Sequence, residues 1–551
     1  MGTAGALMLG ACGGDDDGDE AGTTTTEGGD ATSTTVAAVP RPTLRLPGGD
    51  SGFPSPFAYM RGGGYVQMSF IYDTLLWKDS TGELIPWLAE SYEASDDGLT
   101  YTFALRDDVL WHDGEALTAA DVAFTFDYFN AQTLSPQIII QPLPTISKVI
   151  ATDEYTVEFT LDTPTAVFLT FANAVPIVPE HVWSEIADAP EAQDLAVLVG
   201  SGPYRLEEYT QGEGAYLYTA NDDYFLGRPF VERIENRPVG DELAALQAGD
   251  LDAAGGSGLR PEVLAPFEAD DRFEILEAPP GSGQTALYWN LARGGALADV
   301  SFRRACALAI DREDLVERLF GGNATPGNPG WVPPRSPFHV DVEQYAFDLD
   351  AARALLDDAG YTAGDGGVRQ GPDGQPLSFE LLTASPAEPV VDLIVAALAE
   401  LGVELVARAV DTPTFNQTVI AGEVEMSLIG AGGIDSDPDY MREVYASTTE
   451  RTQHAQGYLN EEFDQLAEEQ LMTLEEADRM PIIAEMQEIV AEDLPLLPLF
   501  YPTSFHIFDP EVFDQWYFTP GGVAQRIPTP YNRQLLATGQ MTGLEVRPTE
   551  E

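Results

Sequence analysis

The sequence predicts a mixed α/β fold divided into at least two lobes. Its 551 residues exceed the roughly 100–200 residues that one domain usually needs. Between Leu99 and Leu105 apolar and polar residues alternate, which is the period of a half-buried strand. Residues 394–401 have helical spacing, Gly402 ends that helix, and residues 403–407 then have strand character. Such helix–glycine–strand successions are typical of α/β units with a partly parallel sheet.

The other elements follow from the same two periodicities. A first strand is expected at 43–46, and the apolar stretch 70–77 is either a helix or a strand edge. Thr118 and Asp121 have the spacing of a capping box that opens a helix. Further along the chain we expect a strand at 155–161, a helix that begins after Asp348 and ends at Gly360, and a continuous helix over 461–493 that ends before Pro495.

Charge restricts the possible partners. The chain has 27 basic and 91 acidic residues, a formal net charge of −64 and a pI near 4.1. Such a surface repels phosphate backbones, so nucleic-acid binding is excluded, and an anionic membrane surface would repel it as well. Because the acidic residues are spread along the whole chain, we interpret them as a solvated surface, which also suits a saline habitat.

No catalytic motif is present in the sequence. A phosphate-binding G-x-x-x-x-G-K loop is absent, and Lys78 and Lys148 are the only lysines. No H-E-x-x-H motif or nucleophile elbow occurs, and the histidines are widely separated. We therefore expect no enzyme activity, no cofactor and no metal site. Trp111–Gly114 is expected to be a packed turn in which local hydrogen bonds satisfy His112.

The two cysteines differ in their surroundings. Cys306 lies in an apolar helical pattern, which predicts a buried thiol. Cys12 follows Leu9-Gly10-Ala11 and resembles a bacterial lipobox, which makes residues 1–12 the remnant of a lipoprotein signal. No basic residue precedes this stretch, so either translation begins further upstream or the resemblance is accidental. The Gly-, Asp- and Thr-rich residues 13–40 cannot form a core, which indicates a flexible tether and favours the lipoprotein.

A series of ordered sequence blocks extends over about residues 43–535. The blocks include Y-D-T-L-L, P-W-L-A-E-S-Y-E, W-H-D-G and L-T-A-A-D-V-A-F in the first part of the chain. I-V-P-E-H-V-W, G-P-Y-R-L, L-Q-A-G-D-L-D, A-I-D-R and L-P-L-L-P-L follow further along. One block alone would be weak, but in this number and order they resemble the family 5 extracellular solute-binding proteins, which serve ABC importers of peptides, nickel and oligosaccharides.

This resemblance implies a hinged, two-lobed fold of the periplasmic-binding-protein type with an extra subdomain inserted in lobe I. Ligand would bind between the lobes, which close and present it to the permease. The protein would be an extracytoplasmic monomer, attached to the membrane only through a lipid anchor. The expected divisions are lobe I at 41–75, 200–278 and 500–545, its inserted subdomain at 76–199, and lobe II at 279–499.

The resemblance also indicates where a ligand would bind. Peptide-binding members hold the ligand's amino group with an aspartate in a Gly-Trp-x-x-Asp-x-x-Asp-Pro segment, and a buried ammonium needs such a partner. Here Ala431 occupies the tryptophan position and Ile434 the anchoring position. Asp435 is the alternative anchor, while Gly432 and Gly433 leave backbone amides open to a ligand. The altered anchor keeps both an oligopeptide and an oligosaccharide open as ligand, and a ligand sensor that signals to a membrane partner is a further alternative.

Aromatic and polar residues near the expected cleft are additional ligand-binding candidates. Aromatic platforms with few polar anchors suit sugars and apolar peptides, although each ring could instead belong to the core. The candidates are Phe53, Tyr59, Tyr288, Trp289, Asn290, Tyr501 and Trp516.

Overall fold

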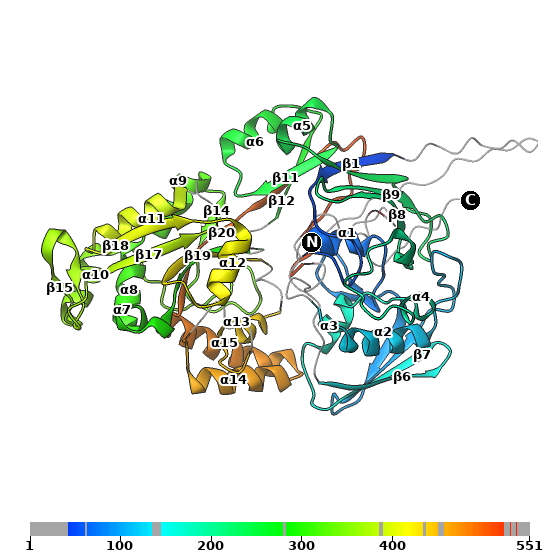
Figure 1. Cartoon of the computed structure of the whole chain (residues 1–551), viewed down its shortest axis with the longest axis horizontal. Helices are drawn as coiled ribbons and strands as arrows, with labels where there is room; N and C mark the ends of the chain where they lie inside the picture. The colour runs from blue at the N-terminus through cyan, green and yellow to red at the C-terminus, as the bar shows by residue number, and fades with distance from the viewer. Residues whose placement is uncertain are drawn as a thin grey trace, which may run out of the picture. The chain divides into compact units, whose positions relative to one another are not determined.

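A computed structural model describes the fold (Figure 1). It describes residues 42–60, 63–134, 145–278, 283–384, 389–432, 437–449, 457–522, 529 and 536. The helices and strands given below, and the contacts given as absent, all refer to this part of the chain.

The first lobe contains a four-stranded sheet in which the first strand is parallel to its neighbour and the others are antiparallel. The strand predicted at 43–46 is present. It pairs with a strand about 190 residues further along the chain, with Leu44 opposite Ile234. The sheet has the order β1 (Thr43–Gly48), β10 (Arg233–Pro238), β9 (Ala215–Ala220) and β8 (Tyr204–Thr210).

A second, antiparallel four-stranded sheet carries a helix on one face. That helix, α2 (Ala119–Ala131), begins as predicted, because the Thr118 N–H donates to Asp121 Oδ2 at 2.9 Å. The alternating residues become strands with alternating burial. The sheet has the order β4 (Ala89–Ala94), β5 (Thr100–Leu105), β7 (Thr156–Leu161) and β6 (Ile146–Asp153), and nearby helices are α1 (Gly63–Ser69), α3 (Phe168–Ala174) and α4 (Glu180–Trp183).

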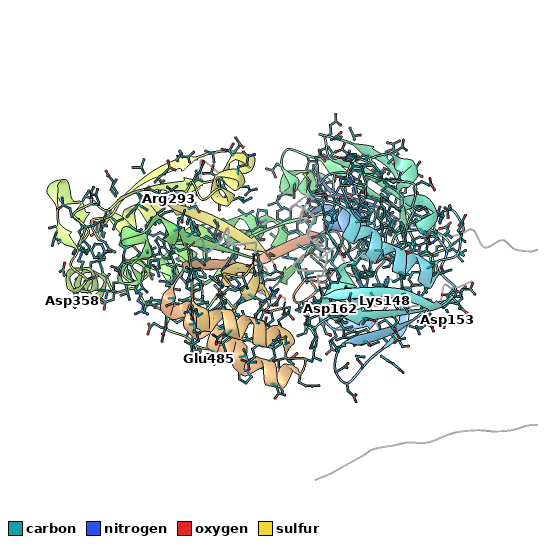
Figure 2. The ribbon with its side chains drawn as sticks, turned by 60° about the horizontal axis from the view of Figure 1, so that its bottom comes forward. Lys148, Asp153, Asp162, Arg293, Asp358 and Glu485 are labelled. Atoms are coloured by element: carbon teal, nitrogen blue, oxygen red, sulfur yellow. The ribbon has the colours of Figure 1, made fainter. Side chains whose placement is uncertain are left out.

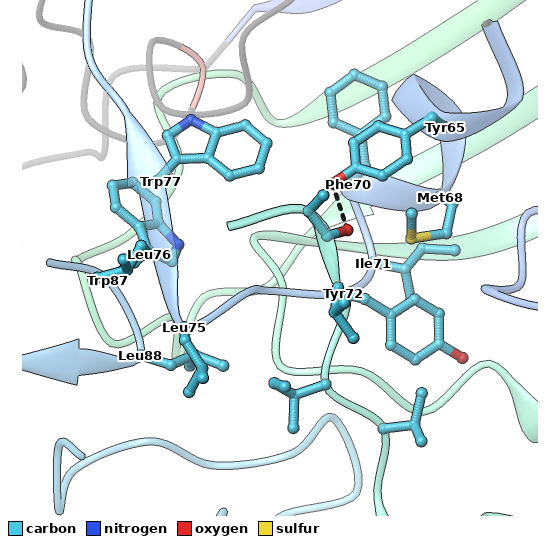
Figure 3. Close-up of a cluster of buried hydrophobic side chains, with 14 of the residues drawn as sticks. Tyr65, Met68, Phe70, Ile71, Tyr72, Leu75, Leu76, Trp77, Trp87 and Leu88 are labelled. Atoms are coloured by element: carbon cyan, nitrogen blue, oxygen red, sulfur yellow. Dashed lines mark hydrogen bonds between the residues drawn. The ribbon is translucent and has the colours of Figure 1, made fainter. Parts of the chain in front are cut away.

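Residues 70–74 form neither a helix nor a strand, in contrast to the prediction for 70–77; only β2 (Leu76–Lys78) is regular, paired with β3 (Leu84–Pro86). The segment carries the buried carboxylate of Asp73. This carboxylate accepts hydrogen bonds from Trp87 Nε1 at 2.8 Å, Ser201 Oγ at 2.8 Å and Tyr224 OH at 3.1 Å. The apolar side chains on both sides of Asp73, among them Phe70 and Trp77, are buried in the cluster that Figure 3 shows.

A three-stranded antiparallel sheet with its own small core adjoins the chain crossings between the lobes. In it Ala278 pairs with Ser504. The strands are β11 (Ala253–Ser257), β21 (Ser504–Phe508) and β12 (Glu274–Ala278), with helices α5 (Glu242–Ala248) and α6 (Pro261–Glu268).

The second lobe is built on a six-stranded mixed sheet, as the helix–glycine–strand pattern predicts. β17 is parallel to both of its neighbours, β18 and β19. The pairs β13–β19, β13–β20 and β14–β20 are antiparallel. The order is β14 (Ala324–Pro326), β20 (Leu496–Pro502), β13 (Gly283–Trp289), β19 (Met426–Gly432), β17 (Ser378–Thr383) and β18 (Glu404–Ala409).

Apolar side chains cover both faces of this sheet. Leu287 and Trp289 of β13 pack into one cluster, while Ala286 and Tyr288 pack into the other. The first cluster involves α8 (Val300–Ala309), α9 (Arg312–Phe320), α10 (Leu349–Asp358) and α11 (Pro389–Ala399). The second involves α12 (Thr412–Ile420), α13 (Tyr440–Tyr445), α14 (Glu461–Met472) and α15 (Glu476–Asp493).

The continuous helix predicted over 461–493 is wrong, because α14 and α15 are separate. At Thr473 the backbone turns to an extended conformation, and the Thr473 hydroxyl donates to the Glu469 carbonyl at 2.8 Å. The turn brings Leu474 against Gly98 of the first lobe, and the Ala166 N–H donates to the Leu471 carbonyl at 2.7 Å. A tertiary contact therefore overrides the helical pattern.

The charged residues follow the solvated-surface interpretation. Lys148, Asp153, Arg293 and Asp358, labelled in Figure 2, are exposed. Cys306 is fully buried, as predicted, and burial raises the pKa of its thiol far above the ordinary value. Within the described residues, no helix is both long enough and apolar enough to cross a membrane.

His112 is satisfied by hydrogen bonds, as predicted, but its partners are not local, because they lie about 90 residues further along the chain. Its Nε2 lies 2.9 Å from the Gly202 carbonyl, and the Gly200 N–H points to Nδ1 at 3.4 Å. Burial lowers its pKa from 6.5 to about 4, against the opposing effect of the Gly202 hydrogen bond. The neutral imidazole is therefore part of the folded state.

We expect His112 to make the protein less stable as the pH falls from 6.5 towards 4. In that window the unfolded chain binds a proton that the folded chain does not, so stability present above pH 6.5 is lost on acidification, by about 3 kcal/mol. Urea unfolding of wild type and His112→Gln between pH 7 and 4 measures this. Equal pH slopes for the two proteins would contradict it.

Candidate functional site

A network of charged and amide side chains follows the end of β19. Asp437 receives two hydrogen bonds from Arg479 of α15, Nη1 to Oδ2 at 2.9 Å and Nη2 to Oδ1 at 2.6 Å. Arg479 Nε also donates to Gln470 Oε1 at 2.9 Å. Arg479 and Gln470 are buried. Two helices of the second lobe thus fix the carboxylate at the start of this segment.

The same network continues to Asp439 at the start of α13. Gln470 Nε2 donates to Asp439 Oδ1 at 2.7 Å, and Arg442 binds both carboxylate oxygens at 2.7 Å. The Asp439 N–H donates to Asp437 Oδ1 at 2.8 Å. We call Asp437, Asp439, Arg442, Gln470 and Arg479 the Asp437–Arg479 network. Each buried charge in it has an opposite charge and further hydrogen bonds, which offset its desolvation.

Lys78 brings a charge of the first lobe to this network. It is only 8% exposed, and burial lowers its pKa, while the charge of Asp437 acts in the opposite direction. One of the chain's two lysines therefore lies at the end of β2, within electrostatic reach of the second lobe. Together with the Ala166–Leu471 hydrogen bond, this places the two lobes in contact on the side of α13 and α14.

The turn after Lys78 is fixed by its own hydrogen bonds. Asp79 Oδ1 accepts from the Thr81 N–H at 2.8 Å and the Thr81 hydroxyl at 2.7 Å. It also accepts from the Glu83 N–H at 3.1 Å. Trp77 and Trp87 pack with ring centroids 6.1 Å apart across the hairpin. These contacts fix the hairpin and therefore the position of Lys78 relative to the rest of the first lobe.

The predicted aromatic candidates of the first lobe are all buried. Phe53 packs edge-on to Tyr209 with centroids 6.0 Å apart, and Tyr59 packs edge-on to Tyr65 at 5.9 Å. Trp516 is 3% exposed and donates from Nε1 to the Phe513 carbonyl at 3.0 Å. In this conformation the three rings pack within the first lobe, and their role in ligand binding stays a prediction.

The candidates on β13 and β20 are buried as well. Tyr288 and Trp289 are 0% exposed, on opposite faces of the sheet. Asn290 Nδ2 donates to the Val424 carbonyl at 2.9 Å, and its Oδ1 accepts from the Ala292 N–H at 3.1 Å. The Tyr501 hydroxyl donates to the Trp331 carbonyl at 3.0 Å. Asn290 and Tyr501 thus hold loops of the second lobe.

The glycine and aspartate candidates lie at the end of β19. Gly432 is its last residue and pairs with Gly283. Gly433, Asp435 and the proposed lipidation residue Cys12 lie outside the described residues. The expectations for them stay predictions.

The sequence analysis missed the side chains that organise this region. Asp437 occupies the Asp-Pro position of the aspartate-containing segment but was not proposed as a site residue, and neither were Arg479 and Gln470. Lys78 was noted only as one of the two lysines. The rarity of lysine is a signal that could have drawn attention to Lys78. The partnership of Arg479 with Asp437 spans 42 residues and leaves no local pattern.

Among the described residues, no cluster of three His, Cys, Asp or Glu side chains is placed to coordinate a metal ion. The region brings the buried Lys78 of the first lobe within electrostatic reach of Asp437 of the second lobe.

The fold and this interlobe region define a two-lobed solute-binding protein of the periplasmic-binding-protein type. The model of the bacterial extracellular solute-binding proteins, family 5, matches residues 83–453. The chain belongs to this family, which confirms the resemblance found in the sequence. Membership makes it an extracellular solute-binding protein rather than a member of an enzyme family.

Two curated relatives cover most of the chain. A putative ABC transporter peptide-binding protein of Brucella ovis is 31% identical over 71% of this chain and 73% of its own length. The oligopeptide-binding protein AppA of Bacillus subtilis is 27% identical over 79% of this chain and 81% of its own length.

Solved structures share the fold. NikA from Brucella suis in complex with Fe(III)-EDTA has a TM-score of 0.77 at 23% identity, covering 89% of this chain and 100% of its own. AppA from Bacillus subtilis in complex with a nonapeptide has a TM-score of 0.72 at 22% identity, covering 86% and 95%. These similarities confirm the hinged two-lobed α/β fold.

We expect Arg479→Met to destabilise the protein by about 3 kcal/mol, because it leaves Asp437 and the buried Gln470 without their shared partner. Arg353→Met is the matched control. Arg353 pairs with Asp350 and Glu400 at the exposed surface, where such a change costs less than about 1 kcal/mol. Urea unfolding of both variants measures the difference, and equal losses would refute the structural role of the network.

Proposed function

We propose that this protein captures an oligopeptide between its two lobes and delivers it to the permease of an ABC importer. The observation that carries the proposal is the 31% identity to a putative ABC transporter peptide-binding protein over 71% of the chain. The likeness to the oligopeptide-binding protein AppA of Bacillus subtilis adds support. An oligosaccharide ligand has no comparable support.

In this proposal the hinge lies where the chain crosses between the lobes. β12 ends at Ala278 and β13 begins at Gly283, while β20 ends at Pro502 and β21 begins at Ser504. The two crossings run side by side, because Ala278 pairs with Ser504. Two adjacent crossings of this kind permit rotation of one lobe against the other. The expected lobe boundary at residue 500 then shifts to the crossing after Pro502, because β20 belongs to the sheet of the second lobe. Lobe I comprises residues 41–75, 200–278 and 504–545 with its inserted subdomain at 76–199, and lobe II comprises residues 279–502.

Ligand would drive closure by contacting both lobes only in the closed state. Lys78 and Asp437 carry opposite charges from the two lobes and attract one another as the lobes approach. The Ala166–Leu471 hydrogen bond lies on the same side of the molecule. These contacts favour closure but supply no ligand selectivity, which must come from groups that face the bound solute.

The proposal also includes a lipid anchor. Lipidation of Cys12 would attach the protein to the membrane, and residues 13–40 would give the binding lobes freedom to reach the permease. A single polypeptide of this kind acts as a monomer beside the permease subunits.

We expect di- to penta-alanine to raise the melting temperature of the protein, and cello-oligosaccharides to leave it unchanged. A ligand that binds only the folded state stabilises it by about 2.7 kcal/mol at a hundredfold excess over Kd. A thermal-shift series at fixed high salt measures this. N-acetylated peptides in the same series show whether a free amino group is required. A shift with oligosaccharides and none with peptides would contradict the proposal.

We expect Cys12→Ser to move the expressed protein from the membrane fraction to the soluble extracytoplasmic fraction, because the thiol that carries the lipid is gone. Fractionation with metabolic labelling by a fatty acid measures this, with Cys306→Ser as the control that should keep both the label and the membrane location. An unlabelled wild-type protein would refute the anchor.

A further inference from the structure

Gln284 is a buried amide whose hydrogen-bonding groups are unused. It is 5% exposed, and neither Nε2 nor Oε1 has a hydrogen-bond partner among the described residues. Burying an amide without partners costs free energy that the chain could avoid with an apolar residue of similar size. The position therefore calls for an explanation beyond packing.

Other buried glutamines of the second lobe are satisfied. Gln487 Nε2 donates to the Phe338 carbonyl at 2.7 Å, and its Oε1 accepts from the Val340 N–H at 3.3 Å. Gln470 bridges Arg479 and Asp439. The lobe thus satisfies a buried carboxamide where the amide serves the fold. Gln284 is the exception among these three.

The place of Gln284 in the sheet connects it with the interlobe region. It is the second residue of β13, directly after the crossing from the first lobe, and it pairs with Ala431 of β19. The adjoining pair is Gly283 with Gly432, the last residue of β19. Asp437, which Lys78 of the first lobe approaches, follows that strand end. Gln284 therefore stands at the sheet end nearest the hinge and the segment that the first lobe meets.

On the β19 side the register places only small residues beside Gln284: it pairs with Ala431, and Gly430 and Gly432 flank that position. A Cβ atom placed on Gly430 would meet only the Gln284 carbonyl, at 3.8 Å. Strand ends composed of such residues let the backbone of a ligand approach closely. Because Gln284 is 5% exposed, binding of a ligand to its amide requires that opening of the lobes uncover it.

A carboxamide side chain discriminates between ligand groups by the hydrogen bonds that it can donate and accept. It offers two N–H donors and one carbonyl acceptor and carries no charge, so it pairs fully with a group that presents both a carbonyl and an N–H. A peptide unit is such a group. A carboxylate or an ammonium ion would use only half of the amide and would lose its own hydration without compensation.

We propose that the Gln284 side chain binds a neutral peptide unit of the ligand and is a specificity-determining residue of the binding region. This inference rests on the proposed function and identifies the part of the ligand that the second lobe recognises. The Gln284 amide, which has no hydrogen-bond partner in the free protein, then gains partners in the complex. Ligands that contain a peptide unit therefore bind more tightly than ligands that lack one.

The test compares Gln284→Leu with Gln487→Leu, the same substitution at a satisfied buried glutamine of the same lobe. Gln284→Leu should keep or raise the melting temperature of the free protein and raise the Kd for tetra-alanine about tenfold in calorimetry. Gln487→Leu should lower the melting temperature and leave the Kd within about twofold of wild type, because it breaks the hydrogen bonds of this side chain to Phe338, Val340 and Ile483.

Three results would overturn the inference. An unchanged Kd in Gln284→Leu, with wild type binding normally, would show that the amide does not contact the ligand. A marked loss of stability in the free Gln284→Leu protein would show that the amide serves the fold. If wild type binds none of the peptides from di- to penta-alanine, the proposed function fails, and the inference fails with it.

Discussion

The two adjacent chain crossings between the lobes are the constraint on which the rest of the structure depends. β12 and β21 pair on one side and β13 and β20 pair on the other, so the same two segments enter two different sheets. Each lobe closes its own apolar cores, and each can therefore stay intact when the other rotates. Fixed lobes on a narrow connection are what a binding protein that opens and closes requires.

The chain separates its charges according to their function. Asp153 and Asp358 are among the acidic side chains of the described residues that are exposed to solvent, where water hydrates their charge. Inside, carboxylates occur with full sets of partners, as at Asp73 and in the Asp437–Arg479 network. Lys78 is buried where the lobes meet. The Gln284 amide, which has no hydrogen-bond partner among the described residues, is the polar group that we assign to ligand binding.

Much of the fold could be predicted from the sequence, because local patterns encode it. The alternating strands and the cap at Thr118 depend on neighbours along the chain. His112 was expected to be buried and satisfied, but its partners Gly200 and Gly202 are distant in the sequence. The break between α14 and α15 could not be predicted in this way. It arises where Leu474 meets Gly98, and contacts between distant segments leave no local period.

The candidate site was harder to predict for the same reason. An aromatic residue looks alike in sequence whether it lines a cleft or fills a core, and the candidates Tyr288, Trp289 and Trp516 are buried. Arg479 and Gln470 act on Asp437 and Asp439 from helices far along the chain. The missing hydrogen bonds of Gln284 become visible only when every neighbour is in place.

Hydrogen–deuterium exchange with and without a bound peptide tests the central claim most directly. If the two lobes close around the ligand, protection should rise together in the segment around Lys78 and in α13, and exchange in the cores of both lobes should change little. The crossings near Ala278 and Ser504 should respond as well. Protection confined to one lobe, with no change at the crossings, would contradict closure about this hinge.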